Sequence, residues 1–249
     1  LKVLGRIHNH TEALNAIDTA LALFSKVNVD IMYALPNQTV QSALHDVNTA
    51  INTGASHISA YHLTMEPNTA FGHTPPAGLP EDETAIDIEE AVHQTLNDAG
   101  FIHYETTAFA RSGHQCRHNL NYWQFGDYLA IGAGAHGKVT IDDRYGNQTL
   151  TADKVSDEVL KKVSTETGIY RFSKSRLPKD YMGYQDEAKQ NEINQNNQIV
   201  TIPKKLIPPK MVGWQAIASD ELVSEFMLNA LRLHDGVAWT LFEARTGRS

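Results

Sequence analysis

The chain has 249 residues, enough for one large domain or for one domain and part of a second. Hydrophobic residues make up 41% of it, as in an ordinary globular protein, and no apolar run is long enough to cross a membrane. The net charge of −8 disfavours a nucleic acid partner, and the single cysteine, Cys116, excludes an internal disulfide and fits a reducing compartment.

Helix and strand patterns alternate along the first hundred residues. Asn9 and Glu12 have the spacing of a capping box, and apolar residues at helical spacing follow them. Acidic residues open the third helix, where the helix dipole favours negative charge. The predicted elements are a helix after Asn9, a strand at 27–36, a helix from Thr39 to Gly54, a strand at 57–63, a helix from 81 to about 99, and a strand at 101–109.

This alternation predicts an α/β fold with a mainly parallel sheet and crossover helices, either a barrel or an open doubly wound sheet. Three units are too few for an eight-fold barrel. The chain also begins at Leu1 inside a predicted turn and stops at Ser249 soon after a helical pattern. We therefore expect a fragment of a longer protein.

The pattern changes after Lys138. A strand and turn are predicted first, then a short helix at 156–163 and a polar, Asn/Gln-rich connector at 185–200. An amphipathic helix at 219–233 and the start of another at 237–247 follow. These two helices open a helix-turn-helix or winged-helix module, or form a helical cap on the sheet.

Gly132, Gly134 and Gly137 have the G-x-G-x-x-G spacing of a dinucleotide-binding loop. Such a loop needs a strand before it and a helix after it, so that the helix N-terminus faces the phosphates. Residues 128–131 could form the strand, but the β-branched sequence after Gly137 is a poor helix former. The glycines more readily allow backbone to approach a neighbouring strand or a flat ligand.

The run "GHQCRHNLNYW" at 113–123 gathers histidine, cysteine and aromatic residues. Histidine is a common axial ligand of heme iron, and aromatic side chains suit a flat macrocycle. No C-x-x-C motif accompanies the run, so a closed zinc site is not indicated. The alternative is a polar loop with hydrogen-bonded histidines and a packed tryptophan.

Asp30 lies in an otherwise apolar strand, where a buried carboxylate must be paired or hydrogen-bonded. It could form a structural salt bridge or accept hydrogen bonds from ligand hydroxyls such as those of a ribose. Arg6 would be its companion beside a ligand, or else a solvated residue at the start of a helix.

Five stretches together resemble one family: "LGRIHN", "VDIMYALPNQT", "ISAYHLTMEPNTAF", "CRHNLNYWQFGDYLAIGAGAHGK" and "EFMLNALRL". They are similar to the HemW-type heme chaperones, which are radical S-adenosylmethionine (SAM) proteins related to oxygen-independent coproporphyrinogen III oxidase. The H-N-x-x-Y-W run at 118–123 is the most specific part, and it resembles the motif tied to heme in the chaperones.

The resemblance implies a partial (β/α) barrel of the radical SAM type with a small, mainly helical, truncated winged-helix-like C-terminal domain. The expected domains are 1–183 for the C-terminal part of a (β/α)6 barrel with its extension, 184–218 for a polar connector, and 219–249 for the start of the C-terminal domain.

The resemblance also implies cofactors. A [4Fe–4S] cluster would be held by three cysteines of an N-terminal segment that this chain lacks, so no metal ligand is expected here and radical chemistry should not proceed in it. The residues expected around S-adenosylmethionine are Arg6, Asp30, Thr64, Gly132, Gly134 and His136. The residues expected around heme are His118, Asn119, Tyr122 and Trp123.

Three functional hypotheses follow. The parent protein is a heme chaperone that passes heme to recipient hemoproteins, in the cytoplasm or peripherally at the inner membrane face. Alternatively, it is a coproporphyrinogen III oxidase that performs oxidative decarboxylation in porphyrin biosynthesis. The third hypothesis is that the fragment alone is a non-functional half-barrel with an exposed sheet edge.

Overall fold

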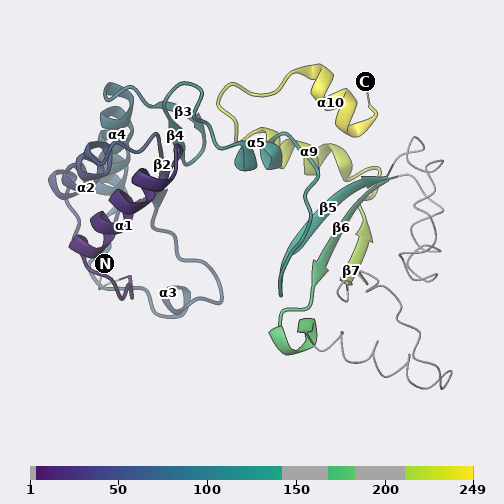
Figure 1. Ribbon diagram of the computed structural model, residues 1–249, viewed down its shortest axis with the longest axis horizontal. Coiled ribbons are helices and arrows are strands. Elements are labelled where there is room, and N and C mark those ends of the chain that lie inside the picture. The colour runs from purple at the N-terminus through teal and green to yellow at the C-terminus, as the bar shows by residue number, and fades with distance from the viewer. Residues whose placement is uncertain (1–3, 142–167, 183–210, 249) are drawn as a thin grey trace. The chain divides into compact units, whose positions relative to one another are not determined.

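The computed structural model describes residues 4–141, 168–182 and 211–248 (Figure 1). The chain forms two compact units. The first contains Leu1–Leu120 and the segment Ala230–Val237, and the second contains Asn121–Asn229 and Ala238–Ser249. The predicted helix at 156–163 and connector at 185–200 lie outside the described residues.

A four-stranded sheet with the order β1-β2-β4-β3 organises the first unit (Figure 1). Strands β1 (Asn28–Tyr33) and β2 (His57–His62) are parallel and in register, from Asn28 opposite His57 to Tyr33 opposite His62. Strands β3 (Ile102–Glu105) and β4 (Ala108–Ala110) form an antiparallel hairpin that pairs with β2 through β4. Strand β1 is therefore one of the two edge strands in this order.

Local sequence signals set the helix boundaries in this unit. Asn9 caps α1 (His10–Leu23) through the predicted capping box, and Thr39 caps α2 (Val40–Asn52) through a reciprocal pair with Ser42. Gly54 and Gly100 follow α2 and α4 (Asp82–Asp98) with positive φ angles of 83° and 82°, as helix-terminating glycines do. A short helix, α3 (Ala70–His73), lies in the proline-rich loop.

The core of the first unit lies between the sheet and its helices. Helix α2 buries Ala43, Val47 and Ala50, because apolar residues recur on one of its faces. The fully buried large side chains of this core include Ile58 of β2, Ile88, Val92 and Leu96 of α4, and Phe101 and Phe109 of the hairpin region.

The segment Ala230–Val237 forms backbone hydrogen bonds with the β3–β4 hairpin, although the two lie far apart in the sequence. The Thr106 amide donates to the Arg232 carbonyl at 3.0 Å, and the His234 amide donates to the Tyr104 carbonyl at 3.2 Å. Leu233 forms an antiparallel bridge with Glu105. The first unit is therefore completed by residues near the end of the chain.

The second unit contains an antiparallel sheet of β5 (His136–Ile141), β6 (Gly168–Lys174) and β7 (Met211–Ala216), in that order. Two helices follow β7 in the sequence, α9 (Leu222–Ala230) and α10 (Trp239–Thr246) (Figure 1). Phe226 and Phe242 are buried in this unit with their ring centroids 5.2 Å apart.

A buried lysine anchors the loop before β5 in the second unit. The Lys138 ammonium donates to the Phe125 carbonyl at 3.0 Å and to Asp127 Oδ1 at 3.3 Å, and it lies 4.1 Å from the centroid of the Phe125 ring. Burial lowers the pKa of Lys138, and the nearby Asp127 carboxylate acts in the opposite direction. The carboxylate and the aromatic face compensate the charge that folding buries.

Several predicted elements differ from the observed ones. Residues 101–109 form the β3–β4 hairpin instead of one strand, and residues 128–131 contribute only the isolated bridge of Tyr128 with Lys138. Of the described strand pairs, only β1–β2 is parallel. Strand β7 occupies part of the stretch predicted as a connector. None of the described helices combines the length and apolarity that a membrane crossing needs.

Candidate functional site

The sheet of the first unit has an apolar face and a polar face, because successive side chains of a strand alternate between the two. Val29 of β1 and Ile58 of β2 are buried in the core. Asn28 and Asp30 alternate with Val29 along β1, and their partners in register on β2 are His57 and Ser59. A row of polar side chains therefore lines the face opposite the core.

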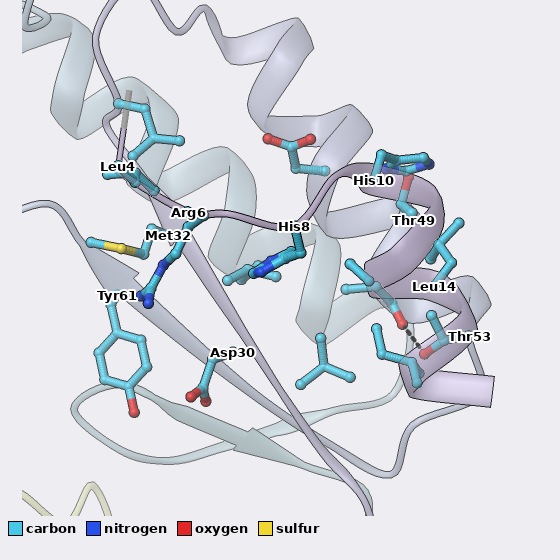
Figure 2. A pocket seen from close by; sticks show the side chains of 17 residues that line it. Leu4, Arg6, His8, His10, Leu14, Asp30, Met32, Thr49, Thr53 and Tyr61 are labelled. Carbon is cyan, nitrogen blue, oxygen red and sulfur yellow. Dashed lines mark hydrogen bonds between the residues drawn. The ribbon is translucent and has the colours of Figure 1, made fainter. Parts of the chain in front are cut away.

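A cavity of about 520 Å³ lies beside β1 (Figure 2). Its walls come from the segment before α1, from α1, β1 and α2, and from Tyr61 of β2. Arg6 and Asp30, both predicted to bind the cofactor, line it, and Figure 2 shows their side chains around the same space as Tyr61. The cavity thus combines a guanidinium, a carboxylate and an aromatic ring.

The expectation that Asp30 is buried is wrong. Its side chain is exposed, and Oδ1 accepts a hydrogen bond of 2.7 Å from Asn28 Nδ2. The apolar neighbours of Asp30 in the sequence suggested a strand buried on both faces. Strand alternation instead points the carboxylate away from the core and toward the cavity.

Thr64 lies just beyond β2 and is exposed. Its hydroxyl donates to Glu66 Oε1 at 3.4 Å, and it is not among the residues that line the cavity. Its predicted contact with an adenosine group stays a prediction.

Gly132 and Gly134 form a turn that leads into β5, with φ angles of 96° and 71°. The Gly134 amide donates to the Ser175 carbonyl at 2.6 Å, and the Gly132 amide donates to the Tyr181 hydroxyl at 3.2 Å. A strand follows them rather than a helix, which confirms the argument against a dinucleotide-binding loop.

Gly137 allows the close approach of a neighbouring strand. A Cβ atom at this position would lie 2.2 Å from Cζ of Phe172, which pairs with Gly137 across β5 and β6. His136, beside it, is exposed at the start of β5. Asp30 and His136 belong to different sheets and different units, so the adenosyl pocket that they were expected to share stays a prediction.

The four residues predicted to contact heme lie on helix α5 (Arg117–Trp123). His118 and Tyr122, and likewise Asn119 and Trp123, are four residues apart and so lie on common faces of the helix. His118 is exposed, whereas the other three are half-buried. The Tyr122 ring lies 4.4 Å from the Tyr128 ring in an edge-to-face arrangement, which fixes the aromatic end of the helix.

Sequence reasoning missed a buried polar network beside the cavity. His57 is 5% exposed, and its Nδ1 lies 2.6 Å from Asn28 Oδ1 while its Nε2 lies 2.7 Å from the Tyr104 hydroxyl. The Tyr104 oxygen accepts a hydrogen bond of 3.2 Å from the Cys116 amide. These residues are far apart in the sequence, so no spacing pattern could reveal the network.

Burial shifts the pKa values in this network. It lowers the pKa of His57, while the nearby Asp30 carboxylate acts in the opposite direction. Burial also raises the pKa of Tyr104 to about 12, although hydrogen bonds from the Cys116 amide and the Asn119 side chain oppose the shift. Both side chains are therefore held in their neutral forms at neutral pH.

The described residues contain no group of three or more His, Cys, Asp or Glu side chains that could hold a metal ion. The lone cysteine of the whole chain, Cys116, is half-buried at the start of α5. Three thiolates for an iron–sulfur cluster are therefore not present in this sequence.

The fold is similar to that of a solved radical SAM enzyme. Coproporphyrinogen III oxidase (HemN) from Escherichia coli superposes with a TM-score of 0.63 over 99% of this chain and 50% of that one. The sequences are 14% identical, so the match concerns the fold alone. The chain therefore has a fold of the radical SAM class.

Sequence comparison narrows this class. No known family model matches the chain. Heme chaperone HemW from Haemophilus influenzae is 41% identical over 100% of this chain and 53% of its own length. HemW from Escherichia coli is 52% identical over 57% of this chain and 38% of its own length.

A mouse protein, mitochondrial radical S-adenosyl methionine domain-containing protein 1, is 30% identical over 94% of this chain and 54% of its own length. The chain is homologous to these HemW and radical SAM proteins, and it spans about half the length of the full-chain relatives that it matches.

Proposed function

We propose that the protein carrying this chain is a heme chaperone that binds heme and transfers it to recipient hemoproteins. The observation that carries the proposal is the 41% identity with a heme chaperone along the whole chain, which includes the H-N-x-x-Y-W run on α5. A cytoplasmic location, with or without peripheral contact with a membrane face, is part of the same proposal.

The cavity beside β1 fits part of S-adenosylmethionine. The Arg6 guanidinium can form a bidentate pair with the methionine carboxylate, and the Asp30 carboxylate can accept hydrogen bonds from ribose hydroxyls. Tyr61 offers an aromatic wall. Thr64, Gly132, Gly134 and His136 are proposed as further contacts from the family resemblance, without support from the cavity lining.

The iron–sulfur cluster does not fit this chain alone, because Cys116 is its single cysteine. In the proposal the cluster belongs to a segment outside this sequence. No chemical step is assigned to it here, and the function of the described residues is to bind and orient ligands.

Helix α5 is proposed to contact heme. His118 is exposed and can offer an imidazole nitrogen to heme iron, while Tyr122 and Trp123 can pack against the porphyrin. The Tyr104 hydroxyl accepts a hydrogen bond from the Cys116 amide just before the helix, which holds the start of α5 in place.

Hemin titration of the full-length protein tests the proposal. Absorbance in the Soret region should show saturable binding, and His118→Ala should weaken it. His73→Ala removes an exposed histidine from α3 and should leave binding unchanged. Equal binding by wild type and His118→Ala would remove His118 from the proposal.

The same preparation discriminates the oxidase alternative. The likeness to coproporphyrinogen III oxidase rests on fold at 14% identity, which does not establish an activity. Cluster-loaded full-length protein should therefore form no protoporphyrinogen from coproporphyrinogen III with S-adenosylmethionine and an electron donor. Turnover of that substrate would favour the oxidase over the chaperone.

A further inference from the structure

A continuous chain of hydrogen bonds runs from the cavity to the start of α5. Asn28 donates to Asp30 at 2.7 Å, and Asn28 Oδ1 lies 2.6 Å from Nδ1 of His57. On its other side, Nε2 of His57 lies 2.7 Å from the Tyr104 hydroxyl, which the Cys116 amide contacts at 3.2 Å. All of these residues belong to the first unit.

The chemistry of the donors and acceptors fixes the direction of every bond. The Asp30 carboxylate accepts only, so the amide nitrogen of Asn28 must face it. The Asn28 oxygen therefore faces His57, whose Nδ1 must carry the proton, and Nε2 is then left as an acceptor for the Tyr104 hydroxyl. Ser59 also donates to the Asn28 oxygen, at 3.1 Å.

The Tyr104 oxygen remains free to accept from the α5 side. It accepts from the Cys116 amide at 3.2 Å. Each hydrogen bond in this series has its donor on the α5 side and its acceptor on the cavity side, and the last acceptor is the Asp30 carboxylate. Hydrogen bonds that point the same way polarise one another, so such a chain is stiffer than its separate bonds.

The middle of this series of hydrogen bonds is buried, so its loss cannot be compensated by water. Tyr104 is 4% exposed, Ser59 is 2% exposed, and the His57 ring packs edge-on against the Tyr104 ring with centroids 5.6 Å apart. If His57 or Tyr104 is lost, the buried polar group of the other remains without that partner. The segment just before His118 is thereby fixed to β1.

We propose that Tyr104 and His57 are positioning residues that tie residues 116–119, which include the heme-facing His118, to the cavity residue Asp30. The inference rests on the proposed function, because it assigns a purpose to the position of His118. Burial also lowers the pKa of His57, which agrees with a neutral ring that accepts from Tyr104.

The test compares Tyr104→Phe and His57→Leu with Tyr33→Phe in the full-length protein. Tyr104→Phe removes one buried hydroxyl and keeps the ring. Tyr33 is a matched control, because it is 5% exposed and so about as buried as Tyr104. Its hydroxyl also donates to a partner, Glu89 at 3.0 Å, on the other face of the sheet.

The first readout is hydrogen exchange without heme. In both Tyr104→Phe and His57→Leu, the peptide covering residues 113–120 should exchange about fivefold faster, as expected for the loss of one hydrogen bond, while Tyr33→Phe leaves it unchanged. Unchanged exchange in either variant, or equal acceleration in Tyr33→Phe, would overturn the inference.

The second readout is hemin binding. Tyr104→Phe should weaken hemin binding about fivefold and change the Soret spectrum. Tyr33→Phe should bind hemin as tightly as the wild type does and give the same spectrum. If His118→Ala weakens binding and Tyr104→Phe does not, the positioning inference fails and the proposed function stands. If the wild type binds no heme while the exchange differences persist, the proposed function fails and only the tether between 116–119 and Asp30 remains.

Discussion

Gly137 illustrates how a single residue can look like a ligand motif and serve packing. Its spacing from Gly132 and Gly134 matches a dinucleotide-binding loop, yet the Phe172 ring occupies the place where a Cβ would stand, 2.2 Å from its Cζ. The sequence left a neighbouring strand and a flat ligand open as explanations. The structure selects the neighbouring strand for Gly137.

Substitution of Gly137 by Ala should therefore destabilise the second unit. The added methyl group must displace a buried aromatic ring, and overpacking of this kind costs about 1–3 kcal/mol. Urea denaturation measures the change. Gly168→Ala on β6 is the control, because its nearest contact would be an ordinary 3.5 Å to Tyr170, and equal losses in both variants would contradict the packing explanation.

The candidate site shows which residues a sequence can reveal. Arg6 and Asp30 were predicted from motifs, and the structure brings both to one cavity. The exposure of Asp30 was not predicted, because the sequence does not show which face of a strand is covered. His57 and Tyr104 were missed because 47 positions separate them and only the fold brings them together.

At the scale of elements, local signals predicted most of the first unit. The capping residues Asn9 and Thr39 and the terminating glycines Gly54 and Gly100 act within one helical turn, so they can be read without knowing the fold. The β3–β4 hairpin was missed because its turn is Thr106-Thr107, and neither residue is a typical turn former.

The cap of α2 supports a prediction. Thr39→Ala removes the oxygen that accepts from the Ser42 amide at 3.2 Å, and it should lower the free energy of unfolding by about 1 kcal/mol. Thr39→Ser keeps a hydroxyl at the cap and should retain most of the stability. Thermal denaturation followed by circular dichroism distinguishes the two, and an equal loss in both would argue against a capping role.

Helix α4, the hairpin and the segment Ala230–Val237 meet at three histidines. The His103 ring lies 3.9 Å from the His234 ring and 4.9 Å from the His93 ring, and it stacks on Phe109 at 4.0 Å. Burial lowers the pKa of His103 to about 4, and the neighbouring His234 acts in the same direction. Burial lowers the pKa of His93 as well.

This cluster predicts acid sensitivity. Between pH 6.5, the ordinary pKa of histidine, and pH 4, His103 is protonated in the unfolded chain but neutral in the folded protein. The free energy of unfolding therefore falls as the pH falls through that window. His103→Gln should make urea midpoints less dependent on pH. His45→Gln, an exposed position on α2, is the control, and identical pH slopes in wild type and His103→Gln would refute the assignment.

At the scale of the whole molecule, the two units contribute different parts of the proposed function. The first unit contains the cavity with Arg6 and Asp30 and the network that reaches Cys116, whereas the second contains the glycine turn before β5. The family resemblance predicted the fold class, which the match to a radical SAM enzyme confirms. Periodicity alone predicted three α/β units and could not choose between a barrel and an open sheet.

Ligand binding should link the cavity to the stability of the full-length protein. A ligand that binds only the folded state stabilises it by about 2.7 kcal/mol at one hundred times its dissociation constant. S-adenosylmethionine should therefore raise the melting temperature, and Asp30→Asn should reduce the increase because an amide accepts ribose hydroxyls less strongly than a carboxylate. Asp18→Asn, exposed on α1 outside the cavity lining, should preserve the full increase. If Asp30→Asn and wild type show the same increase, Asp30 does not contact the ligand, and the cavity beside β1 is not its binding site.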